Sequence, residues 1–408
     1  MYDWANSVFA TVVIAGFFPV VFKSYWGANL ASTETTFWLG SANAAASLVV
    51  VCLAPFLGAI GDKYFLRKEL LLVFMLFGVV STALFAINPQ GAWLLALVLY
   101  ISATIGFMAA NIFYDALLVP VSQYAQIDKV SGLGYGMGYL GGGLLLAICV
   151  YLSQQPALLG YSESIDAVLL SFLIVAIWWL VFSLPLALWT QDIQGDVEQS
   201  SKDGIISTTL MGFKKVFRQR QSRLFLFAYW IYIDGVDTII RMAVDYGMAI
   251  GLESSDLILA LLITQFVGFP AAIIYAYIGY HVSVKKSLLA GIVIYGVITW
   301  FAYSMTTARE FYILAVSIGL VQGGVQAMSR SFFGRMIPQG QSAEYFGIYN
   351  MLGKSAAIMG PLMMGAVSLI SGSHRYSILS ILLLFILGGY LLSRVEDISK
   401  PTGSVAAG

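Results

Sequence analysis

The chain has 408 residues, of which 59% are apolar and 10% charged, and its mean hydropathy is +0.85. A soluble domain is about 25% charged, so this composition excludes a water-soluble enzyme, a secreted disulfide scaffold and a disordered protein, and it predicts a membrane protein. Lys and Arg balance Asp and Glu at 21 each, so no net charge favours nucleic acid as a partner.

Twelve segments are apolar enough to cross a bilayer, which takes about 20 residues. The first begins almost at the N-terminus, where Met1-Tyr2-Asp3-Trp4 lacks the basic region of a cleavable signal peptide. The expected fold is therefore an all-α polytopic membrane protein. Its spans are predicted near residues 3–24, 36–60, 69–88, 92–118, 134–153, 165–189, 222–248, 255–279, 287–306, 310–332, 343–370 and 375–394.

One connection is long and polar, and it divides the spans into six and six. Residues 190–221 carry five Lys or Arg residues and are predicted to form a solvated linker. The domains are then an N-terminal six-helix bundle at 1–189 and a C-terminal six-helix bundle with a short tail at 222–408. Two repeated bundles around a midplane site are typical of secondary transporters.

The distribution of cations predicts the orientation of the chain. With the N-terminus inside, the inner loops, helix ends and tail hold fifteen Lys or Arg residues, while the outer loops hold Lys23, Arg309 and Arg375. Cytoplasmic loops carry the excess of cations. Both termini are therefore expected in the cytoplasm, and a bacterial inner membrane is the expected location.

Polar residues inside the spans concentrate in the first, fourth, seventh and tenth. Ionisable groups at the centre of a membrane helix cost at least about 2.5–3.5 kcal/mol each, so they mark cavities or pathways. Equivalent helices of three-helix repeats recur every three spans, so these four form one set around a central cavity. Local pairing, as between Asp237 and Arg241, is the alternative. The residues are Asp3, Asn6, Asn111, Asp115, Asp234, Asp237, Arg241, Asp245, Gln322, Gln326 and Arg330.

Each polar residue type suggests a role in binding a small metabolite. Arg241 is expected to anchor a substrate carboxylate, and Asp234 or Asp237 to hold an ammonium group or carry a coupling proton. Neutral hydrogen bonds are expected from four amides. Three charged residues nearer the cytoplasmic helix ends are predicted to form a gate. The amides are Asn6, Asn111, Gln322 and Gln326, and the gate residues are Asp3, Asp115 and Arg330.

No metal or cofactor site is predicted. Cys52 and Cys149 lie in apolar runs, and the two histidines, His281 and His374, are far apart in the sequence. The segment 136–141 matches Gly-x-Gly-x-x-Gly, but no strand precedes it. The glycines at four-residue spacing there instead predict close helix packing.

The end of the second span resembles the loop signature of the major facilitator superfamily. It reads Gly58-Ala-Ile-Gly61-Asp62-Lys63-Tyr-Phe65-Leu-Arg67-Lys68, with Phe65 in place of the signature's glycine. This resemblance implies that Asp62, Lys63 and Arg67 form a cytoplasmic latch. In the corresponding loop after the eighth span Tyr280 stands where the acid would be, so a second latch is expected to be weak or absent.

Four further stretches are similar to one branch of that superfamily, the vacuole-effluxer-like transporters. They lie at residues 2–10, 131–142, 234–240 and 322–331, the last being followed by Pro338, Phe346-Gly347 and Gly360-Pro361. The resemblance runs from residue 2 to about 365. It implies the major facilitator fold and a transport role, and fungal members of the family release amino acids from the vacuole.

The expected function is secondary active transport of a small polar metabolite, with an amino acid as the favoured substrate and a proton as the favoured coupling ion. The expected partners are this substrate, the proton and the lipid bilayer, and the protein is expected to be a monomer. Two alternatives stay open, namely a transporter of a lipid, drug or siderophore-like amphiphile and a receptor without transport. A membrane enzyme is disfavoured, since no nucleophile and base motif occurs.

Overall fold

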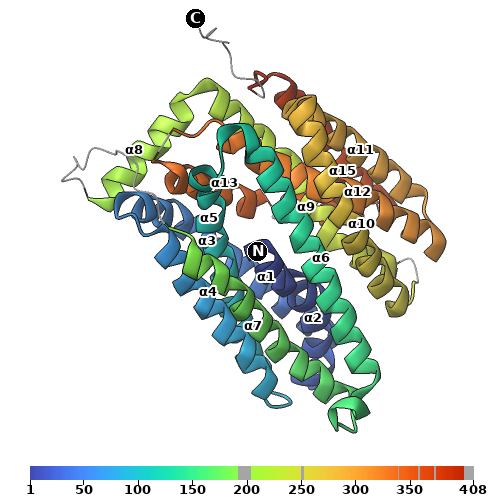
Figure 1. The fold of residues 1–408 in the computed structure, drawn as a ribbon. Helices are drawn as coiled ribbons and strands as arrows, with labels where there is room; N and C mark the ends of the chain where they lie inside the picture. The colour runs from blue at the N-terminus through green and yellow to red at the C-terminus, as the bar shows by residue number, and fades with distance from the viewer. Residues whose placement is uncertain (192–203, 250–251, 339, 357–358, 372–373, 399–408) are drawn as a thin grey trace, which may run out of the picture.

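The computed structural model describes residues 1–191, 204–249, 252–338, 340–356, 359–371 and 374–398, and every regular element in these ranges is helical. Most helices of the N-terminal half lie towards the lower left of Figure 1, and most of those of the C-terminal half lie towards the upper right. The N-terminal half contains α3 (Ser32–Lys63), α4 (Arg67–Ala83), η3 (Leu84–Ile87), α5 (Trp93–Val121), η4 (Tyr124–Gln126), α6 (Ile127–Gln154), η5 (Pro156–Leu159) and α7 (Ser164–Trp189).

The first span is one continuous helical run from Tyr2 to Trp26 with two π-helical stretches. Pro19 has no N–H to donate to the preceding turn, so regular α-helical bonding is interrupted near it. Short π-helical insertions in α-helices are frequent at functional sites. The run consists of α1 (Tyr2–Val8), η1 (Phe9–Phe17), α2 (Phe18–Val21) and η2 (Phe22–Trp26).

The C-terminal half repeats the pattern of antiparallel helices. The predicted eleventh span, 343–370, consists of two helices, and residues 357–358 between them lie outside the described part of the chain. The elements are α9 (Arg220–Ala249), α10 (Ser254–His281), α11 (Val284–Ser304), α12 (Ala308–Gly334), α13 (Ser342–Ala356), α14 (Met359–Ser371) and α15 (His374–Ser393).

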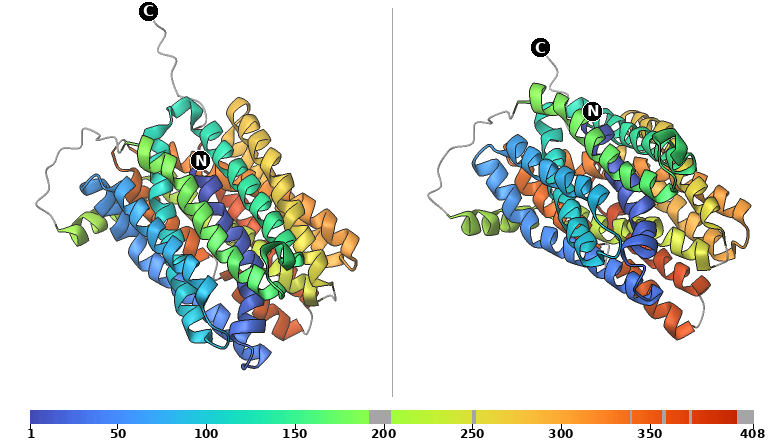
Figure 2. Two further views of the ribbon diagram at one scale, coloured as in Figure 1. Left: turned by 60° about the horizontal axis from the view of Figure 1, so that its bottom comes forward. Right: turned by 90° about the horizontal axis from the view of Figure 1, so that it is seen from below.

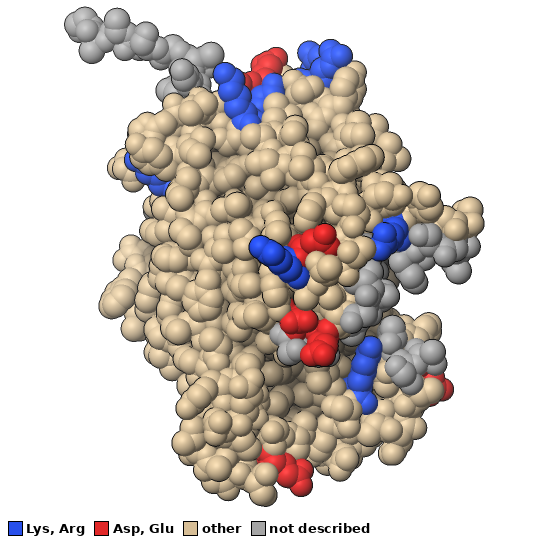
Figure 3. All heavy atoms as spheres, turned by 90° about the vertical axis from the view of Figure 1, so that its right-hand side faces the viewer, with Lys and Arg blue, Asp and Glu red and all other residues tan. Residues whose placement is uncertain are grey.

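Ten helical segments among the described residues are long and apolar enough to cross a membrane. The seventh predicted span, α9, does not meet this criterion and carries four ionisable residues at 234–245. The α13–α14 pair takes the eleventh place. On the face in Figure 3, charged side chains gather in a few groups, and a broad surface beside them carries none. The prediction of an all-α polytopic membrane protein is confirmed.

Part of the predicted linker is helical. Within residues 190–221, predicted as a solvated linker, Ile205–Arg218 form the helix α8. Its buried residues are Thr209, Gly212 and Val216, and it packs against α3, α9 and α13. In both views of Figure 2 it projects from the side of the bundle. This helix was not predicted, because the cations of the segment indicated a solvated loop. The apolar residues at helical spacing among them were not taken into account.

The two halves meet along a seam, defined here as the contacts of α3 and α5 with α13 and of α6 with α10 and α12. Glycines allow the backbones to approach closely there. A Cβ atom at Gly347 would lie 2.6 Å from the Ala54 carbonyl oxygen, and one at Gly58 would overlap the Ala343 carbonyl oxygen. Small residues at helix interfaces have this effect in membranes. The seam positions the charged residues described next.

Candidate substrate pathway and gate

Arg330 of α12 lies at the centre of a buried cluster that joins the two bundles. Its guanidinium lies 3.2 Å from the Asp115 carboxylate of α5 and 3.8 Å from the Asp3 carboxylate of α1. It also donates to the Ser131 hydroxyl of α6 at 3.0 Å and to the Ser131 carbonyl at 3.1 Å. Four helices, three of them from the opposite bundle, therefore depend on one cation.

Aromatic rings enclose this guanidinium. The Arg330 Cζ lies 4.6 Å from the ring centroid of Tyr135 and 5.4 Å from that of Tyr114. The Tyr114 hydroxyl also donates to the Asp3 carboxylate. Gly134 leaves the necessary space, because a Cβ atom there would overlap the Asp3 carboxylate and lie 3.2 Å from the guanidinium. The site is thus packed tightly around its charges.

Both carboxylates of this cluster have further hydrogen bonds. The Asn350 amide of α13 donates to Asp115 at 3.0 Å, and the residue is itself buried. Buried charges are tolerated when they are paired and hydrogen-bonded, and removing one partner is strongly destabilising. The structure brings Asp3, Asp115 and Arg330 together, and their role as a gate stays a prediction. We call Asp3, Tyr114, Asp115, Ser131, Arg330 and Asn350 the gate cluster.

A second connection across the seam involves the loop signature. The Asp62 carboxylate at the end of α3 accepts the backbone N–H groups of Ala343 at 3.0 Å and Glu344 at 2.7 Å, which belong to the first turn of α13. A helix N-terminus favours an acceptor carboxylate. Arg67 donates to Asp62 at 2.7 Å and to the Gly340 carbonyl at 3.2 Å. We call these contacts the latch.

The third residue of the predicted latch, Lys63, lies over an aromatic ring. The Lys63 Nζ is 5.8 Å from the ring centroid of its neighbour Tyr64, which is exposed. Asp62 bonds across the seam to the first turn of α13, and Arg67 bonds to Gly340, two positions before that helix.

Tyr280, predicted to weaken a second latch, makes its own contact across the seam. The Lys129 ammonium at the start of α6 lies 3.9 Å from the centroid of the Tyr280 ring at the end of α10. A cation over an aromatic face is attracted by the ring quadrupole. Beside it, the buried pair of Arg335 and Asp128 joins α12 to α6. These two contacts connect the bundles where a weak or absent second latch is expected, and the strength of that latch stays a prediction.

The remaining predicted binding residues lie farther along their helices, away from the gate cluster and the latch. Asn6 of α1 donates to the Asn111 side chain of α5 at 2.6 Å, so these two predicted residues are brought together within the N-terminal bundle. Asp237 of α9 and the two amides of α12, Gln322 and Gln326, are each half-buried. Half-buried polar groups at this level suit a solvated pathway.

Asp234 occupies a different environment from Asp237. It is 1% exposed, and its carboxylate accepts the backbone N–H of Gly360 at 3.0 Å, in the first turn of α14. Thr238 packs on the same glycine, where a Cβ atom would overlap its hydroxyl. Arg241, the predicted carboxylate anchor, lies in α9, and its side chain is outside the part of the chain whose side chains are described.

The two halves of the chain share one sequence pattern in their first helices. Asp3-x-x-Asn6-Ser7 in α1 corresponds to Asp234-x-x-Asp237-Thr238 in α9. In both halves the hydroxyl faces a glycine of another helix, since a Cβ atom at Gly138 would lie 2.5 Å from the Ser7 Oγ. Asn6 and Asp237 therefore occupy matching positions, as repeated bundles require. Six further residues that make the contacts described above were not among the residues predicted from the sequence. They are Tyr114, Lys129, Ser131, Tyr135, Asn350 and, in the latch, Glu344.

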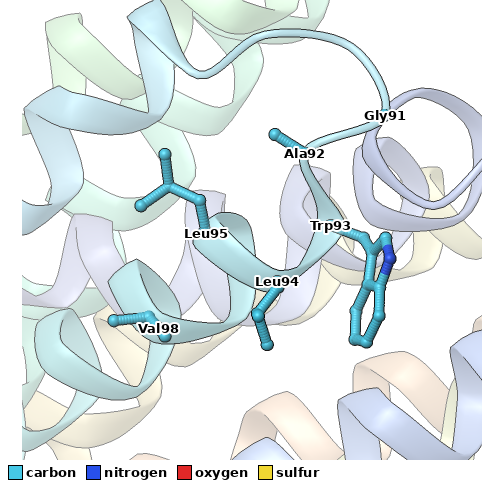
Figure 4. A pocket seen from close by; sticks show the side chains of 6 residues that line it. All are labelled: Gly91, Ala92, Trp93, Leu94, Leu95 and Val98. Atoms are coloured by element: carbon cyan, nitrogen blue, oxygen red, sulfur yellow. The ribbon is translucent and has the colours of Figure 1, made fainter.

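A surface hollow at the start of α5 does not belong to this pathway. It has a volume of about 460 Å³ and is lined by apolar side chains and backbone, which Figure 4 shows spread around the helix start. It lacks the converging polar groups of a binding site. Among the described residues no group of three or more His, Cys, Asp and Glu side chains suits a metal ion. The lining residues are Gly91, Ala92, Trp93, Leu94, Leu95 and Val98.

Comparison with known families covers most of the chain. Residues 34–400 match the family model described as "Vacuole effluxer Atg22 like". A protein of Bacillus subtilis (strain 168), the "Uncharacterized MFS-type transporter YxiO", is 37% identical over 402 residues, which is 97% of this chain and 94% of that protein. Autophagy-related protein 22 of Coccidioides immitis (strain RS) is 26% identical over 83% of this chain and 69% of its own length.

Solved structures share the fold at low sequence identity. The human organic anion transporter MFSD10 (TETRAN) matches with a TM-score of 0.76 at 15% identity, over 96% of this chain and 97% of that chain. The proton:xylose symporter XylE matches with a TM-score of 0.71 at 14% identity, over 97% and 94%. The first is described as a transporter and the second as a major facilitator superfamily symporter. At these identities the likeness shows the fold alone.

Proposed function

Because the chain belongs to the vacuole effluxer Atg22-like family of major facilitator transporters, we propose that it moves a small zwitterionic metabolite, of the amino-acid class, by proton-coupled alternating access. It is an integral membrane transport protein and not an enzyme.

The observation that carries the mechanism is the position of the gate cluster and the latch. Both lie at one end of the molecule, together with α8 and Ile398, and we call this the linker end. Contacts of Arg330 and Asp62 bridge the two bundles there. A substrate can leave through this end only when these bonds break. We place this end in the cytoplasm, in a bacterial inner membrane, with one chain as the working unit.

The proposed substrate site lies between the gate cluster and the opposite end. Asp237, Gln322 and Gln326 are half-buried on helices of the C-terminal bundle. Asn6 and Asn111 bond to each other in the N-terminal bundle, where Asn6 has the repeat position that matches Asp237. Arg241, one turn beyond Asp237, would take the carboxylate of a zwitterion. Asp237 would take the ammonium group, and the amides would supply neutral hydrogen bonds.

Of the two candidate coupling residues, Asp237 suits a proton better than Asp234. The buried Asp234 carboxylate accepts a backbone N–H at the start of α14, which suits a structural role as a helix cap. Asp237 is half-buried and can reach solvent. A unit charge moved through 100 mV supplies roughly 2.3 kcal/mol, which is sufficient for modest accumulation.

The first test is a thermal-stability screen of the purified protein against amino acids, organic acids, sugars, nucleosides and lysolipids. A ligand at 100 times its Kd stabilises the folded state by about 2.7 kcal/mol. We expect an amino acid to raise Tm, with loss of the shift in Asp237→Asn and Arg241→Met. Asp166→Asn, in the first turn of α7, is the matched control and should retain it. If only lysolipids or other amphiphiles raise Tm, the amino-acid proposal is wrong.

A flux measurement in sealed vesicles then separates a transporter cycle from binding alone. We expect the stabilising amino acid to accumulate when a proton gradient is imposed, and accumulation to stop on adding a protonophore. Asp237→Asn should remove the gradient dependence. Accumulation that is driven equally well in this variant would exclude Asp237 as the coupling residue.

A further inference from the structure

The linker helix α8 has three faces with different surroundings. Thr209, Gly212 and Val216 are buried against the bundle. Ile206 and Leu210 are 69% and 64% exposed, and they belong to a stripe with Phe213 and Phe217, at spacings of four, three and four residues. These spacings place the four side chains along one face of a helix. We call them the apolar stripe.

Cations border the apolar stripe and no acid accompanies them. Lys214 lies four residues after Leu210 and directly after Phe213, and Arg218 lies directly after Phe217. These spacings place both cations beside the stripe, and both are exposed. From residue 205 to residue 223 the chain carries five Lys or Arg residues and no Asp or Glu. An apolar face bordered by cations is the pattern of helices that lie in the interface of an anionic membrane.

The apolar stripe continues the surface that faces lipid. The Phe217 ring stacks on Phe213, with centroids 6.2 Å apart, and packs on Phe227 of α9, with centroids 6.0 Å apart. Phe227 is 43% exposed on α9, the seventh helix of the membrane bundle. α8 also crosses the direction of the bundle helices instead of following it (Figure 1). The stripe is therefore placed where bundle surface and membrane surface meet.

The buried face of α8 contacts the latch. A Cβ atom at Gly212 would overlap the Glu344 carboxylate, so the helix backbone rests directly on this side chain. The backbone N–H of the same Glu344 donates to Asp62. Lys215 donates to the Gln341 side chain at 2.7 Å, one residue before α13 begins. Since α8 also packs on α3, it spans both sides of the seam.

We propose that α8 is a binding site for anionic phospholipid of the adjacent leaflet, and that lipid bound there stabilises the closed latch. The acyl region takes the apolar stripe, and Lys214 and Arg218 take the phosphate groups. Because the buried face of the same helix rests on Glu344, fixing α8 in the interface holds α13 against Asp62. The inference takes the cytoplasmic placing of the linker end from the proposed function.

The first experiment asks whether the stripe enters lipid. In a Cys52→Ala, Cys149→Ala background, a bimane label is placed at Leu210→Cys, or at Ser207→Cys on the polar face as the matched control. The protein is held in nanodiscs of phosphatidylcholine, with or without phosphatidylglycerol. We expect doxyl-lipid quenching of the label at position 210 to increase with phosphatidylglycerol and that at position 207 to stay low. Equal quenching at both positions would overturn the proposal.

The second experiment asks whether lipid acts on the latch. Ser342, in the first turn of α13, is 2% exposed, so Ser342→Cys should react with a maleimide only when the latch opens. Phosphatidylglycerol should slow this reaction about fivefold, roughly the contribution of one cation at an anionic surface. The Lys214→Glu, Arg218→Glu double variant should lose the effect. Lys23→Glu with Arg309→Glu, which changes the charge equally away from α8, should retain it.

Two results would contradict this assignment. A labelling rate at Ser342→Cys that is independent of phosphatidylglycerol would show that lipid does not act on the latch. Protection of the Leu210→Cys label that increases with protein concentration in detergent would assign the stripe to a second copy of the chain. Neither measurement uses a transported substrate, so failure here is distinguishable from failure of the proposed transport function.

Discussion

The Asp62 carboxylate accepts the backbone N–H of Glu344 at 2.7 Å, across the seam between the bundles. The bond joins a side chain at the end of α3 to the first turn of α13, so it exists only while the two helices meet. Asp62 also accepts from the Ala343 N–H and from Arg67. Closure of the linker end therefore depends strongly on one carboxylate.

Asp62→Asn should open the latch. The amide keeps one acceptor oxygen but loses the charge, and a hydrogen bond to a charged group contributes about 1.5–3 kcal/mol, so the open population should rise by about tenfold or more. The measurement is the maleimide reaction rate of Ser342→Cys in the cysteine-free background. Glu69→Gln, an exposed change in the first turn of α4, is the control. An unchanged rate in Asp62→Asn would show that the latch does not hold the closed state.

Gly58→Ala should prevent closure by a steric effect. The added methyl group would overlap the Ala343 carbonyl oxygen. This neighbour is a backbone atom, so no flexible side chain can move away to make room. Gly40→Ala on the same helix is the control, because nothing lies within 4 Å of its Cβ position. We expect rapid labelling of Ser342→Cys and loss of flux in Gly58→Ala, and normal behaviour in Gly40→Ala. Full transport by Gly58→Ala would contradict the close approach of these helices.

Arg330→Met should destabilise the protein strongly. It leaves the Asp3 and Asp115 carboxylates buried without their guanidinium, and breaking a buried ion pair in this way costs about 3–5 kcal/mol. Arg330→Lys should be intermediate, since lysine keeps the charge but lacks the planar fork that reaches Ser131 and Asp115 together. Thermal unfolding in detergent measures the loss. Arg309→Met, at an exposed position in the first turn of α12, should change Tm little.

Tyr280→Leu should loosen the contact between α6 and α10. It removes the ring 3.9 Å from the Lys129 ammonium, a contact of about 0.5–1 kcal/mol at an exposed site. Electron paramagnetic resonance distances between spin labels at Val130→Cys and Val282→Cys should broaden in this variant. Tyr280→Phe keeps the ring and should restore the narrow distribution. A broad distribution in Tyr280→Phe as well would assign the effect to the hydroxyl group.

Part of the candidate site was predictable from residue type alone. Asp3, Asp115 and Arg330 stand out because a charge inside an apolar helix is costly, so its presence signals a cluster or a pathway. The partners were not predictable. Ser131 and Asn350 are ordinary polar residues in sequence. Their bonds to Arg330 and Asp115 exist because α6 packs on α12 and α13 packs on α5.

Local sequence features were sufficient for the membrane class and the family, because both can be recognised from short stretches: apolar runs of spanning length and motifs such as Gly58 to Arg67. Tertiary structure alone decided which groups meet. Asp234 caps α14, Tyr280 faces Lys129, and α8 rests on Glu344. Such contacts depend on where helices cross, and crossing points are set by packing between residues far apart in the chain.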